Sequence, residues 1–297
     1  MSATAEVFSY YPGCLAAQSA REYDASIRRL AGLVDASLED INDWNCCGAG
    51  VVQQADEAAG RALARRNLDR AGGDRVVVSG CPICVARLRE AASDEAACHV
   101  LDLLARPDLR ERIAAKIGAT GEKRPVGSLK VACFYGCQFP QAAGEQTGAG
   151  EDASTPLEAL MTLAGASVVT WRGSRRCCGG YRLFSEPEVG FETLRKIFRD
   201  FTKSGADAIV TACPHCHFNL DAFQYTVGRR QKRALEVPVL HFTEVLALAM
   251  NLEAAEKWLD RHVTSPFGLL DRLYVEEEKR KRAEGRARKT KPKKEQQ

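Results

Sequence analysis

The cysteine residues of this chain recur in a pattern that constrains the fold more than any other feature of the sequence. Twelve of the 297 residues are cysteine. Each half contains a lone cysteine preceded by glycine, an adjacent pair followed by glycine, and a Cys-Pro-X-Cys element. The two sets are Cys14, Cys46, Cys47, Cys81 and Cys84, and Cys137, Cys177, Cys178, Cys213 and Cys216. The adjacent pairs are 131 residues apart and the Cys-Pro-X-Cys elements 132 apart, which indicates an internal duplication.

The residues around the cysteines predict an α/β fold. Short β-branched runs at residues 75–80 and 208–212 lead into the two Cys-Pro-X-Cys elements and are typical of buried strands. A proline follows, and proline suits the first turn of a helix. We expect further strands at residues 7–11, 100–103, 129–135, 167–171 and 237–241. We expect helices at residues 23–33, 57–70, 156–163, 190–203 and 243–250. This alternation predicts two tandem, pseudo-symmetric domains, each a small sheet with flanking helices.

Composition and charge suggest where these domains begin and end. The segment 116–128 is the expected join, which gives a first domain at residues 1–124 and a second at 125–275. Residues 141–155 are rich in Gly, Ala and acidic residues and are expected to form a surface loop. The chain has 42 Lys and Arg against 39 Asp and Glu. Ten of these basic and two of these acidic residues follow residue 278, so the body has a net charge of −5. We expect residues 276–297 to be a basic, disordered tail.

The overall composition is that of a soluble globular protein, with 45% apolar and 27% charged residues. No apolar run approaches the roughly 18 residues of a membrane helix. The first residues lack the basic and apolar segments of an export signal. We therefore expect a cytoplasmic protein with no direct membrane insertion. In a reducing compartment, metal binding or thiol chemistry explains twelve cysteines better than disulfides do.

The thiols are compatible with several kinds of site. A Cys-Pro-X-Cys element alone could be a thioredoxin-like redox pair, but this leaves the lone cysteine and the adjacent pair unexplained. A structural zinc ion in one or both halves needs four thiolates, whereas each half has five. Adjacent cysteines serve different atoms of a metal cluster more readily than a single zinc ion. Scattered buried thiols would not predict a twofold repeat. An iron–sulfur cluster remains, although the C-x2-C-x2-C run of ferredoxins is missing.

Three local sequences carry a family resemblance, namely Tyr11-Pro-Gly-Cys14, Asp43-Trp-Asn-Cys-Cys-Gly48 and Tyr135-Gly-Cys137. With the two cysteine sets, they resemble the doubled cysteine-rich CCG domain and, over residues 6–250, the B subunit of heterodisulfide reductase. The resemblance implies a noncubane [4Fe-4S] cluster in each half, with all ten cysteines as ligands and the substrate disulfide entering between the clusters. The gaps from Cys47 to Cys81 and from Cys178 to Cys213 are slightly shorter than in the methanogen enzymes, which leaves the substrate open.

The resemblance also implies a reaction and partners. Cleavage of a disulfide takes two electrons, and two clusters that flank one S–S bond can each deliver one. The chain would then be an oxidoreductase that cleaves or forms a disulfide, acting on a small disulfide or on a lipoate-type sulfur carrier protein. The implied partners are an HdrC-like subunit with cubane iron–sulfur clusters and an HdrA-like flavoprotein. Related CCG proteins occur in lactate, glycolate and succinate oxidation, so an electron-relay subunit of a quinone- or flavin-linked dehydrogenase is the alternative.

Two histidines are candidates for catalysis. His215 and His217 flank Cys216, so either could donate a proton to a released thiolate. Both could equally be structural residues that contact the cluster ligands. No Gly-x-Gly-x-x-Gly run follows a strand, so we expect this chain to bind no flavin or nicotinamide itself.

The remaining cysteines and tryptophans have structural interpretations. Cys133 has no counterpart in the first half, and Cys98 precedes the strand expected at residues 100–103; both are expected to be core residues outside the ligand sets. Trp44 and Trp171 precede the adjacent pairs and are expected to pack around the clusters. The body is acidic and the basic residues are concentrated in the tail, which argues against binding of nucleic acid.

Overall fold

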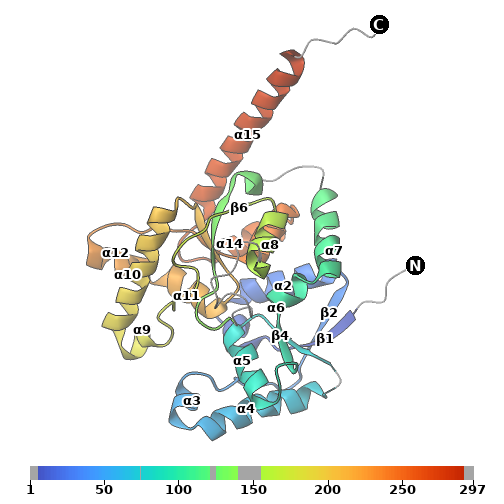
Figure 1. The fold of residues 1–297 in the computed structure, drawn as a ribbon, viewed down its shortest axis with the longest axis vertical. Coiled ribbons are helices and arrows are strands. Elements are labelled where there is room, and N and C mark those ends of the chain that lie inside the picture. The colour runs from blue at the N-terminus through green and yellow to red at the C-terminus, as the bar shows by residue number, and fades with distance from the viewer. Residues whose placement is uncertain (1–5, 74, 121–124, 140–154, 291–297) are drawn as a thin grey trace, which may run out of the picture.

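Two parallel four-stranded sheets, one in each half of the chain, organise the fold (Figure 1). The structure is a computed structural model that describes residues 6–73, 75–120, 125–139 and 155–290. The first sheet contains β1 (Glu6–Tyr10), β2 (Ala36–Asp40), β3 (Val77–Ser79) and β4 (Ala97–His99). The second sheet contains β5 (Lys130–Phe134), β6 (Ser167–Val168), β7 (Ala208–Thr211) and β8 (Val239–His241).

The two sheets have the same topology. Their strand orders are β2-β1-β3-β4 and β6-β5-β7-β8, and all neighbouring strands are parallel. Helical connections return the chain to the start of each new strand, so the carboxyl ends of all four strands meet at one edge of each sheet. The predicted architecture of two pseudo-symmetric α/β units is therefore confirmed.

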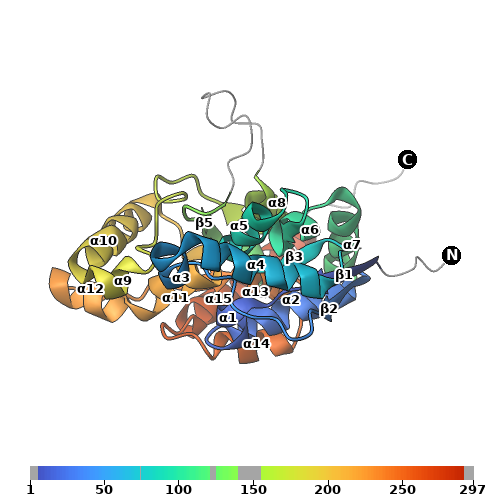
Figure 2. The same ribbon diagram turned by 90° about the horizontal axis from the view of Figure 1, so that it is seen from below.

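Helices surround both sheets (Figures 1 and 2). In the first half they are α1 (Gly13–Ala17), α2 (Arg21–Leu33), α3 (Val51–Ala55), α4 (Glu57–Ala71), α5 (Pro82–Ala91), α6 (Val100–Leu104) and α7 (Pro107–Gly118). A 3-10 helix, η1 (Pro125–Ser128), precedes the second half. The second half contains α8 (Pro156–Leu163), α9 (Arg182–Ser185), α10 (Pro187–Ser204), α11 (Pro214–Ala222), α12 (Gln224–Gln231), α13 (Phe242–Ala249), α14 (Ala254–Leu259) and α15 (Phe267–Thr290).

One expected strand is a helix. Residues 100–103 were expected to be a strand, but they belong to α6, and the strand β4 precedes them. The side chain of His99 explains the change, because its Nδ1 accepts a hydrogen bond from the backbone N–H of Leu101 at 2.9 Å and caps the helix. The expectation of a strand at this position was wrong.

The basic segment near the C-terminus also differs from expectation. We expected a disordered tail from residue 276, but α15 continues to Thr290 and extends away from the body (Figure 1). Its composition explains this, since Lys, Arg, Glu and Ala are good helix formers. The buried side chains of Leu269, Leu270 and Leu273 anchor its first turns. Residues 291–297 and most of the expected loop 141–155 lie outside the described residues.

The two halves share one apolar core. Helix α2 of the first half contributes Tyr23, whose ring stacks on that of His241 with centroids 3.9 Å apart. The Tyr23 hydroxyl donates a hydrogen bond to the carbonyl oxygen of Ala212 at 3.0 Å. The hydroxyls of Ser26 and Thr243 are 2.6 Å apart. These buried contacts fix the halves relative to each other, and with them the two cysteine sets.

Within the described ranges, none of the helices is both long and apolar enough to cross a bilayer.

Candidate metal centres

The cysteines gather at the carboxyl edges of the two sheets. In the first half, the lone cysteine follows β1, the adjacent pair follows β2 and the Cys-Pro-X-Cys element follows β3. The second half repeats this order after β5, β6 and β7. Because the strands of each sheet are parallel, these three chain segments converge at one place. The topology alone therefore brings together the five thiols of each half.

The first-half thiols form a connected group. Neighbouring thiols shift each other's pKa from Cys14 to Cys46, Cys46 to Cys47, Cys47 to Cys84 and Cys84 to Cys81, so the five lie close together. The side chains of Cys14 and Cys46 are exposed, and those of Cys47, Cys81 and Cys84 are buried. One side of the group thus faces solvent and the other faces the protein interior.

The second half repeats this arrangement. Neighbouring thiols shift each other's pKa from Cys137 to Cys177, Cys178 to Cys216 and Cys216 to Cys213. Cys137 and Cys177 are exposed, and the other three cysteines of the set are buried. The structure therefore brings together all five predicted cysteines in each half.

The two groups meet at their buried ends. The thiols of Cys81 and Cys213, the first cysteines of the two Cys-Pro-X-Cys elements, lie close enough to shift each other's pKa. Cys81 and Cys213 thus bring the two cysteine groups next to each other between the halves.

The Cys-Pro-X-Cys turns have the same local structure in both halves. Cys81 and Cys213 are the N-cap residues of α5 and α11, and the following prolines occupy the first helical turn, as predicted. The hydroxyl before each turn accepts a hydrogen bond from the cysteine N–H, Ser79 from Cys81 and Thr211 from Cys213, both at 3.3 Å. Each capping thiol therefore lies at a helix N-terminus, where the helix dipole stabilises a thiolate.

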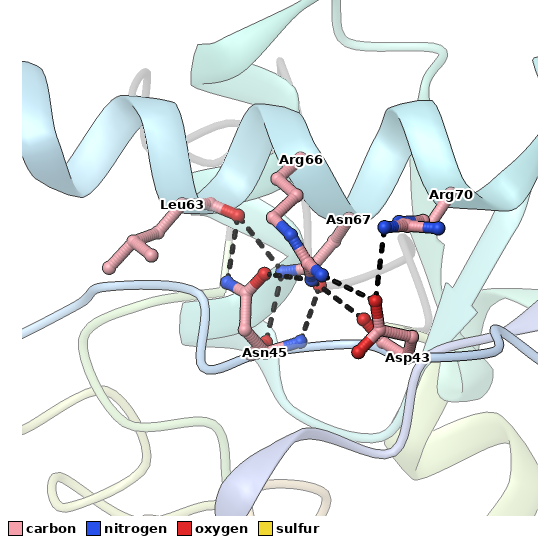
Figure 3. Close-up of polar contacts among 6 residues, drawn as sticks. All are labelled: Asp43, Asn45, Leu63, Arg66, Asn67 and Arg70. Carbon is pink, nitrogen blue, oxygen red and sulfur yellow. Dashed lines mark hydrogen bonds and ion pairs between the residues drawn. The ribbon is translucent and has the colours of Figure 1, made fainter.

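A polar network positions the loop that carries Cys46 and Cys47 (Figure 3). The Asn67 side chain of α4 accepts a hydrogen bond from the backbone N–H of Asn45 at 2.9 Å and donates one to its carbonyl oxygen at 3.0 Å. Arg66 binds the carboxylate of Asp43 at 2.5 Å, and Arg70 binds the same carboxylate at 3.1 Å. Sequence reasoning missed these residues, because only the fold brings α4 against the loop.

In the second half, Asn219 supports the adjacent cysteines Cys177 and Cys178. The side-chain amide of Asn219 on α11 lies 3.4 Å from the Sγ atom of Cys178 and 3.2 Å from the carbonyl oxygen of Gly180. Asn219 is fully buried. Its donated hydrogen bonds lower the cost of a buried thiolate at Cys178. Its position three residues after Cys216 is the only sequence signal that could have identified it.

A glycine before the lone cysteine makes room for a sulfur atom. Gly136 has a φ of +69°, and a Cβ at this position would lie 2.8 Å from the Sγ atom of Cys216. A side chain here would therefore be strained and would displace the thiol. In the second half, this close approach explains why a glycine precedes the lone cysteine.

The thiols have altered acidity. Hydrogen bonds from Cys14 and Cys47 lower the pKa of the Cys46 thiol. A hydrogen bond from Cys137 lowers the pKa of the Cys177 thiol to about 6. Each half therefore has a solvent-facing thiolate at neutral pH, and thiolates are the form of cysteine that binds metal.

The two candidate histidines have different surroundings. His215 is buried beside the first-half cysteines, and its Nδ1 atom has no hydrogen-bond partner among the described residues. The Nε2 atom of His217 lies 3.0 Å from the carbonyl oxygen of Val239, and its ring stacks on His241. Of the two, only His215 lines a cavity formed by the cysteines.

A second polar cluster, separate from the cysteines, surrounds His217. The Nε2 atom of His262 lies 3.0 Å from a carboxylate oxygen of Glu244, and both side chains are buried. Burial alone would lower the pKa of His262, but the Glu244 carboxylate raises it to about 9. Burial and the charge of His262 lower the pKa of His217 to about 3. At neutral pH, His262 is therefore charged and His217 neutral.

The other residues singled out in the sequence pack in the core. Cys133 lies on β5 and is buried, and Cys98 on β4 is half-buried. Burial raises the pKa of both thiols, that of Cys98 to about 11. The Trp171 indole donates a hydrogen bond to the carbonyl oxygen of Cys133 at 2.8 Å, and the Trp44 ring packs edge-on against Tyr11.

The donor set fits an iron–sulfur cluster in each half. Five convergent thiols exceed the four that a tetrahedral zinc ion takes. Two of them are neighbours in sequence, so they suit ligation of different metal atoms. Cysteine thiolate is also the usual ligand of protein iron–sulfur clusters.

Comparison with known families agrees with this arrangement. The sequence profile of the CCG cysteine-rich domain matches residues 8–89 and again residues 131–221. Each match contains one complete set of five cysteines. The predicted resemblance to a doubled CCG domain is confirmed.

Several relatives match over most of their length. The 8-methylmenaquinol:fumarate reductase membrane anchor subunit of Wolinella succinogenes is 28% identical over 86% of this chain and 96% of its own. The B subunit of the ferredoxin/F(420)H(2)-dependent CoB-CoM heterodisulfide reductase of Methanosarcina acetivorans is 25% identical over 90% of this chain and 96% of its own. A protein of Archaeoglobus profundus, described as similar to the heterodisulfide reductase B subunit, is 25% identical over 83% of this chain and 91% of its own.

One solved structure shares the fold. It is a hypothetical protein from Helicobacter pylori, with a TM-score of 0.61 and 10% sequence identity. The match covers 88% of this chain and 52% of that protein. At this identity the likeness concerns the fold alone.

Proposed function

Because this chain belongs to the family of cysteine-rich CCG domain proteins, we propose that it is the iron–sulfur catalytic subunit of a heterodisulfide reductase-like complex. In this proposal the ten cysteines hold two noncubane [4Fe-4S] clusters, five cysteines to each. The observation that carries it is the proximity of Cys81 and Cys213, one from each five-thiol set, which places the two sets side by side. Two sites so close together suit a reaction that needs two electrons at one bond.

The reaction is the cleavage or formation of a disulfide. Cleavage consumes two electrons and two protons and gives two thiols, and formation reverses this balance. When bound, each cluster supplies one electron and an iron atom able to accept a thiolate sulfur. The exposed cysteines of each set face solvent, where a substrate can approach, and the buried ones exclude water. His215, which lines the first-half cavity, is the better placed of the two proposed proton donors.

The proposal includes partners and a compartment. We propose that an HdrC-like subunit with cubane clusters and an HdrA-like flavoprotein exchange electrons with this chain in the cytoplasm. The substrate is a small mixed disulfide in the reductive direction, or a lipoate-type sulfur carrier protein in the oxidative one. The names of the Methanosarcina and Archaeoglobus relatives both refer to heterodisulfide reductase, which supports a reaction at a disulfide.

Metal analysis of protein purified without oxygen tests the proposal. We expect about eight irons and eight acid-labile sulfides per chain, the content of two [4Fe-4S] clusters. Stoichiometric zinc without iron would instead support structural zinc sites and would end the proposal. Zinc in only one half, with about four irons, would restrict it to the other half.

A second candidate function is electron relay without substrate chemistry. The Wolinella relative, named as the membrane anchor subunit of a fumarate reductase, favours it. The two functions differ in whether a thiol reaches the clusters. If the chain is catalytic, adding thiols to the oxidised holoprotein should change its paramagnetic signal. A paramagnetic signal that no thiol changes, together with normal electron transfer to a quinone- or flavin-linked partner, would favour the relay.

A further inference from the structure

The two halves differ at two positions beside the cysteines, although their cysteine patterns are the same. Counting from the adjacent pairs makes Gly50 the counterpart of Tyr181. Counting within the Cys-Pro-X-Cys elements makes Ile83 the counterpart of His215. The second half thus carries a phenol and an imidazole where the first half has no side chain and an apolar one.

Tyr181 reaches across to the first half and packs on its own counterpart. A Cβ at Gly50 would lie 2.5 Å from Cε2 and 2.7 Å from Cζ of the Tyr181 ring. Gly50 also has a φ of +80°, which favours glycine. The absence of a side chain at Gly50 is therefore what allows the ring to lie there.

This ring borders a cavity at the first-half cysteines. All five thiols of that set line the cavity, and so do Tyr181 and His215 of the second half. The two rings meet edge to face with centroids 4.7 Å apart. His215 is only 5% exposed, and its Nδ1 atom has no hydrogen-bond partner in the described part of the chain. The five thiols of this cavity are the proposed ligands of the first-half cluster, so Tyr181 and His215 both lie beside that cluster's place.

The Tyr181 hydroxyl remains a hydrogen-bond donor in this setting. The residue is 40% exposed, so its ring lies at the border between the cavity and solvent. Burial, followed by the charges of Cys14, Cys47, Cys81 and Cys84, raises the pKa of Tyr181. The hydroxyl is therefore protonated throughout the neutral pH range.

We propose that Tyr181, which borders the cavity whose five thiols would hold the first-half cluster, positions one sulfur atom of a small thiol or disulfide by a hydrogen bond from its hydroxyl. The inference rests on the proposed disulfide chemistry. It adds a functional difference between the halves, because the hydrogen-bond donor lies beside only one of the two cysteine sets. Gly50 and Ile83, at the counterpart positions, have no side-chain group that can donate a hydrogen bond. One of the two substrate sulfurs is therefore held on the first-half side.

The test measures thiol binding by the oxidised holoprotein through its paramagnetic signal, with 2-mercaptoethanol as the probe. Tyr181→Phe keeps the ring on Gly50 and removes the hydroxyl, and Tyr181→Ala removes both. Tyr225→Ala is the matched control, because this exposed tyrosine of α12 does not line the cysteine cavity. Iron and sulfide content, measured in parallel, reports whether the clusters are intact.

With full iron content, we expect the half-saturating thiol concentration to rise about fivefold in Tyr181→Phe, the effect of one lost hydrogen bond. It should rise at least about tenfold in Tyr181→Ala and stay unchanged in Tyr225→Ala. If Tyr181→Ala loses iron, Tyr181→Phe decides the question. Unshifted binding in iron-loaded Tyr181→Phe, while the wild type responds, would overturn the inference alone. A wild type indifferent to every thiol would overturn both the inference and the proposed function.

Discussion

The thiol of Cys81 lies next to the thiol of Cys213, its counterpart in the other half of the chain, and each shifts the pKa of the other. Each of these cysteines also caps the N-terminus of the helix that follows it, α5 or α11. The two sheets therefore present their cysteine-bearing edges to each other. Substitutions in one set can consequently be compared with the same substitutions in the other.

The first prediction concerns which cysteines hold metal. Cys14→Ala should lower the iron content by about half, because the first-half set loses one of its solvent-facing thiols. Cys133→Ser and Cys98→Ser should keep the full iron content, since neither residue belongs to a set. Iron and labile sulfide assays on anaerobically purified variants provide the measurement. Loss of iron in Cys133→Ser would contradict the assignment of the ligands.

The second prediction concerns the glycine before the lone cysteine. Gly136→Ala should displace the Cys216 thiol and reduce the iron content, because the new Cβ would meet Sγ at 2.8 Å. Gly205→Ala is the matched control, since Gly205 has a similar φ of +73° but no atom within 4 Å of the added Cβ. Both variants should lose about 1–2 kcal/mol of stability from backbone strain. Equal iron content in the two variants would show that the close approach to Cys216 has no role.

The third prediction is a pH dependence of stability. The pKa of His262 is about 9 in the folded chain against an ordinary 6.5, because the carboxylates of Glu244, Asp221 and Glu22 outweigh its burial. Charged His262 therefore stabilises the fold fully below pH 6.5, and this contribution is lost as the pH rises through about 9. We expect His262→Gln to cost on the order of 2–3 kcal/mol more at pH 6 than at pH 9.5.

Urea unfolding of wild type and His262→Gln at both pH values checks this expectation. The difference between the two proteins isolates His262 from the many cysteines that also titrate in this range. His217, which packs against His262, is neutral throughout because its own pKa is about 3. A difference that does not change with pH would contradict the assigned ion pair with Glu244.

The fourth prediction concerns the basic helix. Deletion of residues 279–297 should leave the iron content unchanged, because the buried anchors of α15, Leu269, Leu270 and Leu273, all precede the deletion. Leu270→Ala, by contrast, should destabilise the protein by about 2–5 kcal/mol through loss of core packing. Iron assays and thermal unfolding distinguish the two variants. Failure of cluster assembly in the deletion would make the basic segment part of the fold.

The sequence predicted those parts of the structure that depend on the cysteines. The two sets, the strands before the Cys-Pro-X-Cys turns and the helical prolines follow directly from residue type and spacing. Strand β2 was not predicted, because its sequence, Ala-Ser-Leu-Glu-Asp, has no β-branched residue and its end is exposed at the sheet edge. An isolated apolar run such as residues 100–103 does not distinguish a strand from a buried helix. In this chain, the His99 cap determines the helix.

The candidate site was predicted less completely than the ligands. Tyr181 has no motif of its own, and its importance depends on a contact with Gly50 that only the packing of the halves creates. His215 and His217 are indistinguishable in sequence, yet they lie on different sides of α11 and contact different elements. To tell two such residues apart, one must know which side of the helix faces the neighbouring sheet, and residue spacing alone does not give this.

The packing of Tyr23 against His241 also has a consequence for how the chain folds during synthesis. The first half leaves the ribosome with the apolar face of α2 uncovered, and this face stays uncovered until residue 241 and its surroundings have been made. At ordinary translation rates the wait is on the order of ten seconds. The nascent chain therefore passes through a stage that invites aggregation, so chaperone supply should affect the yield of soluble protein.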